Sequence, residues 1–140
     1  MAEQRRDEQP IALYPWEGEQ IGNAVVKAER PELSALEFEV APGGGAQLHH
    51  HKRHSDSFYV LSGELEFQVG DQTLLATEGS YVLAPPGVPH GFRNTGDDPA
   101  RALNLHTPGG FVQYWRELSE LRAAGNEPDQ AFFERHDVYD

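Results

Sequence analysis

Apolar and polar residues alternate along residues 33–40 and again along residues 65–69. A period of two is typical of a β-strand with one buried face. Other short apolar segments, rich in β-branched and aromatic residues, also predict strands; they cover residues 21–28, 46–52, 57–61, 73–77, 81–83, 90–94 and 100–106. Glycine and proline turns separate these segments, and no helical pattern lies between them. The chain up to residue 108 therefore predicts an all-β sandwich or closed barrel.

The pattern changes after Pro108. Apolar and aromatic residues recur at helical spacing over residues 111–122, and Gly125 is well placed to end a helix. A second short helix is expected over residues 129–136. We therefore predict a flexible arm over residues 1–10, a β-barrel over residues 11–108, and a helical segment over residues 109–140 that packs on the barrel.

Length and charge narrow the possible partners. The 140 residues suffice for one domain with a core of its own. The formal net charge of −12 argues against nucleic acid and against an anionic membrane surface, because both require clusters of Lys and Arg. The first ten residues lack the apolar stretch of a signal peptide, and no apolar run approaches the ~18 residues of a membrane span. We expect a cytoplasmic protein without a membrane partner.

Histidine is the residue type that points to chemistry, because four of the seven histidines fall within residues 49–54. Residues two apart on a strand share a face, so His49 and His51 are expected to point to one side and His50 to the other. Two imidazoles about 6–7 Å apart along a strand can converge on one metal ion. The chain has no cysteine, so such an ion would have nitrogen and oxygen ligands.

Asp56 is expected on the same strand face as Phe58 and Val60. If that face lines the barrel interior, its carboxylate enters an apolar cavity, which is costly unless the charge is paired or coordinated. A metal ion would satisfy it. Further along the chain, His90 shares a face with Phe92 in the same arrangement of one polar group among apolar ones.

Two spaced motifs resemble those of the cupin family. The first contains Gly43, His49, His51, Asp56 and Gly63, and the second contains Gly79, Pro85, Gly87, His90 and Asn94. The resemblance implies a double-stranded β-helix, the jelly-roll barrel of cupins, followed here by short C-terminal helices. It also implies a homodimer and one divalent transition metal per chain, Fe, Mn, Ni, Co or Zn, held by three histidines and a glutamate. The implied ligands here are His49, His51 and His90, with Asp56 in the place of the glutamate.

The fourth ligand is the one departure from the family pattern. Aspartate is one methylene shorter than glutamate, so Asp56 either coordinates the metal or orients a ligand histidine from behind. His54 lies on the same loop and is the competing fourth ligand.

The flanking segments, residues 58–63 and 103–111, resemble small single-domain bacterial cupins related to quercetin dioxygenases. This resemblance implies a metal-dependent dioxygenase. Three imidazoles and one carboxylate leave open positions on such a metal, where a small enediol or aromatic, flavonol-like substrate could bind beside dioxygen, with Asp56 as the catalytic base if it detaches. The expected substrate pocket consists of Phe58, Val60, Phe92, Asn104 and His106. Two alternatives stay open: a metal-dependent isomerase or cyclase, in which the metal polarises a carbonyl group, and a non-catalytic module that binds a small molecule.

Overall fold

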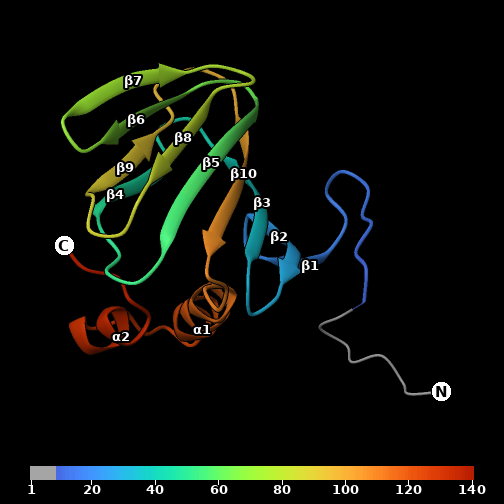
Figure 1. Cartoon of the computed structure of the whole chain (residues 1–140), viewed down its shortest axis with the longest axis vertical. Helices are drawn as coiled ribbons and strands as arrows, with labels where there is room; N and C mark the ends of the chain where they lie inside the picture. Colours follow the sequence, from blue (N-terminus) through green and yellow to red (C-terminus); the bar gives the residue numbers. More distant parts are fainter. Residues whose placement is uncertain (1–8) are drawn as a thin grey trace.

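This computed structural model describes residues 9–140, which form ten strands and two helices (Figure 1). The predicted arm therefore lies mostly outside the described residues. The strands are β1 (Glu19–Ile21), β2 (Ala24–Glu29), β3 (Ser34–Val40), β4 (Gly45–His49), β5 (Ser55–Ser62), β6 (Leu65–Val69), β7 (Gln72–Ala76), β8 (Tyr81–Ala84), β9 (His90–Arg93) and β10 (Ala100–Thr107). The helices α1 (Val112–Ala123) and α2 (Gln130–Arg135) follow. This confirms the predicted all-β fold with short C-terminal helices.

The strands form two antiparallel sheets. One sheet has the order β1-β2-β3-β10-β5-β8 and the other the order β4-β9-β6-β7. The last strand, β10, lies between β3 and β5, so His106 is directly opposite Asp56. In the second sheet, His49 is directly opposite His90. The topology thus brings residues from distant parts of the sequence to one end of the barrel.

The other end of the barrel is filled by an apolar core. Its buried members are Val40, Phe58, Val60, Leu65, Phe67, Ala76, Val82, Ala100 and Ala102. The alternation seen in the sequence has the expected result on β6, where Leu65 and Phe67 are fully buried and Glu66 and Gln68 are exposed. A rigid apolar base of this kind holds the polar end above it in place.

Two predicted strands differ from the observed ones. The segment 21–28 is split into β1 and β2, because Gly22, with φ +57°, and Asn23 form a tight turn between them. The segment 46–52 stays in the sheet only as far as His49. Beyond it, His50 leaves the sheet and forms a bridge with Tyr139 near the C-terminus. His51 is consequently a loop residue and not the strand residue that the sequence predicted. It still lies on the same side as His49, as expected, with the two ring centroids 5.0 Å apart.

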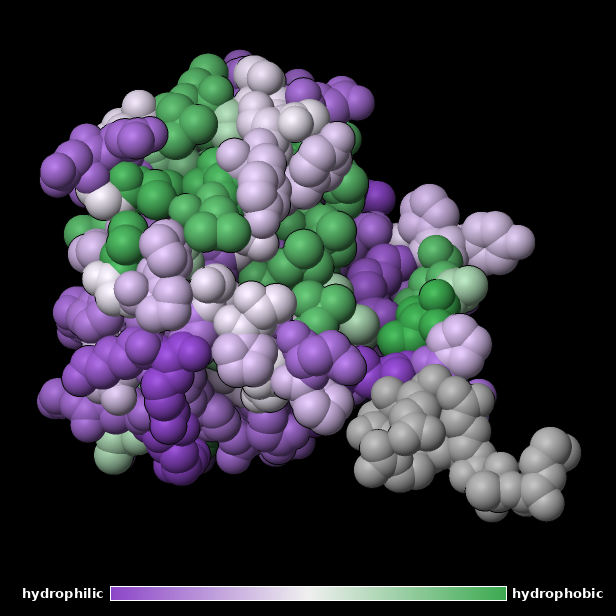
Figure 2. All heavy atoms as spheres, in the orientation of Figure 1, coloured by the Kyte–Doolittle hydropathy of each residue, from purple (hydrophilic) through white to green (hydrophobic). Residues whose placement is uncertain are grey.

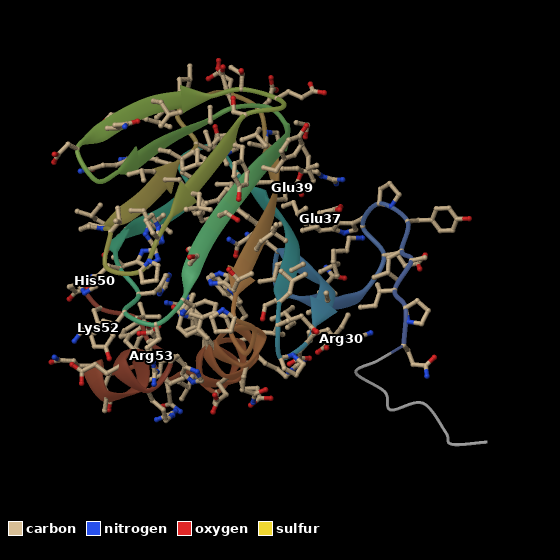
Figure 3. The ribbon with its side chains drawn as sticks, viewed as in Figure 1. Arg30, Glu37, Glu39, His50, Lys52 and Arg53 are labelled. Carbon is tan, nitrogen blue, oxygen red and sulfur yellow. The ribbon has the colours of Figure 1, made fainter. Side chains whose placement is uncertain are left out.

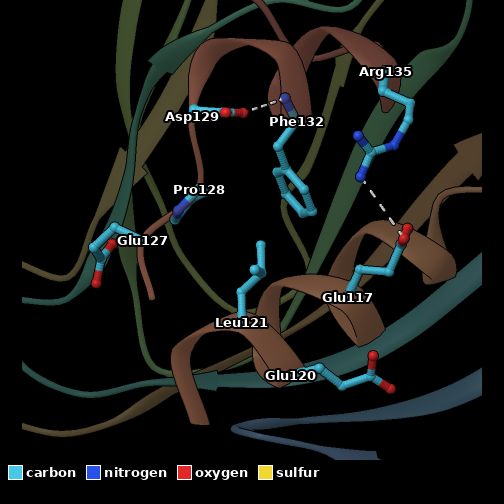
Figure 4. Close-up of a pocket in the computed structure, with 8 residues that line it drawn as sticks. All are labelled: Glu117, Glu120, Leu121, Glu127, Pro128, Asp129, Phe132 and Arg135. Carbon is cyan, nitrogen blue, oxygen red and sulfur yellow. Dashed lines mark hydrogen bonds and ion pairs between the residues drawn. The ribbon is translucent and has the colours of Figure 1, made fainter. Parts of the chain in front are cut away.

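The helical segment packs below the barrel in the view of Figure 1. Arg116 on α1 bonds to Glu19 and Glu29 at 2.7 and 2.9 Å, which ties this helix to β1 and β2. The side chain of Asp129 accepts a hydrogen bond from the Phe132 backbone N–H at 2.8 Å and caps α2. A hollow of about 430 Å³ lies between the two helices (Figure 4). Within residues 9–140, neither helix is long and apolar enough to cross a membrane.

Candidate metal centre

Four potential ligands converge at the polar end of the barrel. We call His49, His51, Asp56 and His90 the metal cluster; their ligand atoms all lie within 4.8 Å of one another. His49 ends β4, His90 begins β9, Asp56 lies on β5, and His51 comes from the loop between β4 and β5. The rings of His49 and His90 have centroids 4.4 Å apart. The structure therefore brings together the four residues that the sequence predicted as ligands.

Each imidazole of the metal cluster is oriented by a backbone carbonyl. His49 Nδ1 lies 2.7 Å from the oxygen of Gln47, and His90 Nδ1 lies 3.0 Å from the oxygen of Val88. His51 Nδ1 lies 2.7 Å from the carbonyl oxygen of Asp137. A carbonyl oxygen only accepts, so in each ring Nδ1–H donates, and Nε2 is the nitrogen that can offer a lone pair to a metal ion once it carries no proton. A metal ligand needs such a lone pair, and its partner at the other ring nitrogen fixes its direction.

The Asp56 carboxylate lies among these rings. Its Oδ2 is 2.8 Å from His90 Nε2 and 3.3 Å from His51 Nε2. Burial opposes the charge of Asp56, but His106, His51 and His90 outweigh it and hold the pKa of Asp56 well below its usual value. Burial also acts to lower the pKa of His90, but its bond to Asp56 prevails and the pKa of His90 is raised. Asp56 is therefore ionised at neutral pH.

The metal cluster fits a divalent cation. Imidazole lone pairs and a carboxylate that face one another at short range repel unless positive charge lies between them. In the metal-free chain the proton favoured on His90 supplies that charge. Burial lowers the pKa of His49 to about 4, so its ring is neutral at pH 7. Three nitrogens and one oxygen suit iron, manganese, nickel, cobalt or zinc.

The second oxygen of Asp56 is held from the neighbouring strand. Asn104 Nδ2 donates to Asp56 Oδ1 at 2.6 Å, and His106 Nε2 lies 3.3 Å from the same oxygen. His106 Nε2 is also 2.9 Å from Asn104 Oδ1. These contacts fix the direction of Oδ2 toward the histidines. A carboxylate held at both oxygens, with a low pKa, suits a fixed ligand better than a proton acceptor, because a general base works best with a pKa near the operating pH.

A second group of histidines adjoins the metal cluster. We call His54 and His106 the flanking pair; together with His51 they also have ring nitrogens within 4.8 Å of one another. Burial lowers the pKa of His54 to about 4 and that of His106 to about 3, so both rings are neutral at pH 7. His54 Nδ1 lies 2.8 Å from Asp137 Oδ2. His54 is not part of the group formed by His49, Asp56 and His90, and this arrangement favours Asp56 as the fourth ligand.

A cavity of about 1120 Å³ opens at the metal cluster. Of the five residues predicted for a substrate pocket, Phe58, Phe92, Asn104 and His106 line it. Val60 does not line it, because this residue is fully buried in the apolar core below. The helical segment supplies a further aromatic wall, which consists of Phe111, Tyr114 and Trp115. Their helical spacing predicted a packed face but gave no sign of which surface it would cover.

Sequence reasoning also missed Asp137, which contacts the loop that carries His51 through both its carbonyl and its carboxylate. No local pattern marks this residue, because it lies 86 positions after His51. His50 points away from the metal cluster, and its ring stacks on Tyr139 with centroids 5.5 Å apart.

Comparisons with known proteins bear on this arrangement. Residues 36–106 match the family model of the cupin domain. The chain is 38% identical over 78 residues to H2HPP isomerase of Bacillus subtilis; the alignment covers 54% of this chain and 32% of that protein. The match therefore spans about a third of the relative's own length.

Solved structures share the fold. A RmlC-like cupin from Shewanella frigidimarina superimposes with a TM-score of 0.61 and 24% identity, over 73% of this chain and 93% of that one. KdgF from Halomonas superimposes with a TM-score of 0.60 and 23% identity, over 64% of this chain and 81% of that one. At these identities the likeness shows the architecture alone.

Proposed function

The chain belongs to the cupin family, and from that premise we propose that it is a metal-dependent enzyme that acts on a small oxygenated organic molecule. One observation carries the proposal. Three imidazoles and the ionised Asp56 converge at the base of a cavity large enough for a small organic substrate. His49, His51, His90 and Asp56 would hold the ion.

The metal, when bound, would supply an open coordination position that polarises a substrate oxygen, and a redox-active metal would also allow chemistry with dioxygen. The rest of the work falls to the chain. Phe38, Phe58 and Phe92 lie on one wall of the cavity, with the rings of Phe58 and Phe92 5.4 Å apart. Such a wall excludes water and favours a flat or ring-containing substrate. Asn104 and His106 keep Asp56 aimed at the metal position and are themselves in the cavity lining.

Dioxygenation of an enediol or flavonol-like substrate is the first reaction that we propose. A single site with nitrogen and oxygen ligands beside an aromatic cavity supports it. Isomerisation is the second candidate, and the similarity to a protein named H2HPP isomerase favours it. The low pKa of Asp56 weighs against this carboxylate as the base in either reaction.

Oxygen consumption separates the two reactions. The protein would be loaded in turn with Fe, Mn, Ni, Co and Zn and given a panel of enediols, flavonols and α-keto acids. Dioxygenation predicts oxygen uptake that depends on a redox-active metal, whereas isomerisation predicts a product of unchanged mass in the absence of oxygen and with zinc as well. If the protein bound molecules of this panel but converted none of them with any of these metals, the enzymatic role would be contradicted, and the protein would be a non-catalytic module that binds a small molecule.

We also propose a homodimer that covers the outer face of β5 and β8. Leu103, Tyr59 and Tyr81 form a row across adjacent strands, and Leu83 lies beside them. The exposed fractions of Tyr59, Tyr81 and Leu83 are 44%, 55% and 46%. Figure 2 shows hydrophobic residues gathered over this part of the molecule. Light scattering should give twice the chain mass at micromolar concentration and the single mass for Tyr81→Glu; a monomeric wild type would contradict the proposal.

A further inference from the structure

The loop that carries His51 is held by residues from the opposite end of the sequence. Because β4 ends at His49, residues 50–54 lie outside the two sheets, and the Gly87 backbone N–H donates to the His51 oxygen at 2.6 Å. The C-terminal segment adds two more backbone bonds: the N–H of His50 donates to the Tyr139 oxygen at 2.8 Å, and the Tyr139 N–H donates to the His50 oxygen at 3.0 Å. Figure 3 shows His50, Lys52 and Arg53 on this loop beside the C-terminal helices.

Asp137 makes the densest set of contacts with this loop. Its Oδ1 accepts a hydrogen bond from the Lys52 backbone N–H at 2.9 Å. Its Oδ2 accepts one from the Arg53 backbone N–H at 2.9 Å and one from His54 Nδ1 at 2.8 Å. Asp137 is only 4% exposed. Three donors on one buried carboxylate favour a single conformation of the loop, since loss of this acceptor would leave the buried Nδ1–H of His54 and two part-buried backbone N–H groups without it.

The backbone of Asp137 acts on the metal cluster directly. With φ +63° this residue reverses the chain after α2, and its carbonyl oxygen accepts the Nδ1–H of His51 at 2.7 Å. That bond leaves Nε2, which lies 3.3 Å from Asp56 Oδ2, as the nitrogen of His51 that can offer a lone pair to a metal ion. The side chain of Asp137 thus fixes the loop, and its carbonyl fixes the tautomer of the ligand on that loop.

We propose that Asp137 is a positioning residue for the metal centre, which acts through His51, and that the C-terminal segment 137–139 is part of the metal site. This inference rests on the proposed metal-dependent function. It assigns a role at the metal site to residues 137–139, which lie outside both cupin motifs, since the second motif ends at Asn94.

The test compares two aspartates of the same helical segment. Asp137→Asn keeps the size and tolerates the left-handed backbone, but replaces one acceptor oxygen by an N–H donor that faces the loop. Asp129→Asn is the matched control, since Asp129 caps α2 and makes no bond to the loop among those that the structure describes. Deletion of residues 137–140 removes the carbonyl as well. Circular dichroism would verify that each variant is folded.

Cobalt titration and the ligand-field spectrum of bound cobalt give the first readout. Asp137→Asn should lose about 10–100-fold in affinity, with a changed spectrum. Asp129→Asn should stay within about twofold, with the wild-type spectrum, even if its melting temperature falls. Unchanged affinity and spectrum in Asp137→Asn would overturn the proposal. An equal loss in Asp129→Asn would also overturn it, because the effect would then be general destabilisation.

Nitrogen-15 spectra of the histidine rings in the metal-free protein give a second readout that does not depend on metal. At pH 8 the wild type should show His51 with a proton on Nδ1, and the deletion variant should show a mixture of tautomers. A wild-type His51 with Nδ1 unprotonated would overturn the positioning role. A wild type that binds no metal but shows the expected tautomer would instead contradict the proposed function alone.

Discussion

Two groups of histidines lie side by side at the polar end of the barrel, and they differ in what their ring nitrogens contact. In the metal cluster, each ring gives its Nδ1–H to a backbone carbonyl and directs Nε2 inward. In the flanking pair, His54 contacts the carboxylate of Asp137 and His106 contacts the side-chain oxygen of Asn104. A carboxylate at Nδ1 can orient a ligand histidine as well as a carbonyl can. The two groups are therefore separated by Asp56, which adds a carboxylate to the ligand atoms of the metal cluster, whereas the group of His51, His54 and His106 contains none.

Removal of two rings of the metal cluster should have the largest effect. Wild-type protein should carry close to one transition-metal ion per chain, and the double variant His49→Ala, His51→Ala should carry none, because only one imidazole would remain. Elemental analysis after dialysis measures this. His50→Ala, altered on the same loop but pointing away, should keep the wild-type content. Full occupancy in the double variant would place the ion elsewhere.

Substitution of Asp56 should have the second-largest effect on metal binding. Asp56→Asn removes the only anion of the metal cluster, so the affinity should fall by more than about 100-fold, beyond the range typical of a supporting residue. Asp56→Glu should bind as well as the wild type or more tightly, since it restores the family's longer carboxylate. Metal titrations decide this. If His54→Ala abolished binding while Asp56→Asn did not, the site would be all-histidine and the two groups would exchange roles.

Acid should weaken metal binding by a smaller, graded amount. The metal needs neutral imidazoles, and the pKa of His90 is raised by Asp56 despite its burial. Binding must therefore displace a proton at any pH below that raised pKa, and the affinity should fall about tenfold per pH unit there. His49, with a pKa of about 4, adds nothing until the pH is lower still. Zinc titrations between pH 5 and 8 measure the slope, and Asp56→Asn should flatten it; a pH-independent affinity would contradict this linkage.

The flanking pair should give the smallest effect. His54→Ala should change metal affinity by less than about threefold, because His54 supports the loop only as one of three donors to Asp137. Thermal unfolding should register the loss more clearly than metal titration does. A loss as large as that of Asp56→Asn would erase the distinction between the two groups.

Local patterns account for what the sequence could predict. The strands followed from a period of two, as in β6, where alternate residues are buried and exposed. Asp56 and His90 followed from spaced motifs that fall on neighbouring parts of the barrel. The sequence did not predict where β4 ends, because residues 50–54 leave the sheet to contact the C-terminal segment, which is far away in the sequence. The carbonyls of Gln47 and Val88 carry no signal either, since every residue has one.

The source of these carbonyls matters to anyone who would transplant the site into another protein. Gln47 and Val88 each precede their histidine by two residues, so a grafted strand would bring its own orienting group for His49 and for His90. His51 would arrive without one, because its acceptor belongs to Asp137. An engineer who copied only the two motifs would obtain two preorganised ligands and one free to rotate. The minimal portable unit is therefore the two motifs plus the last few residues of the chain.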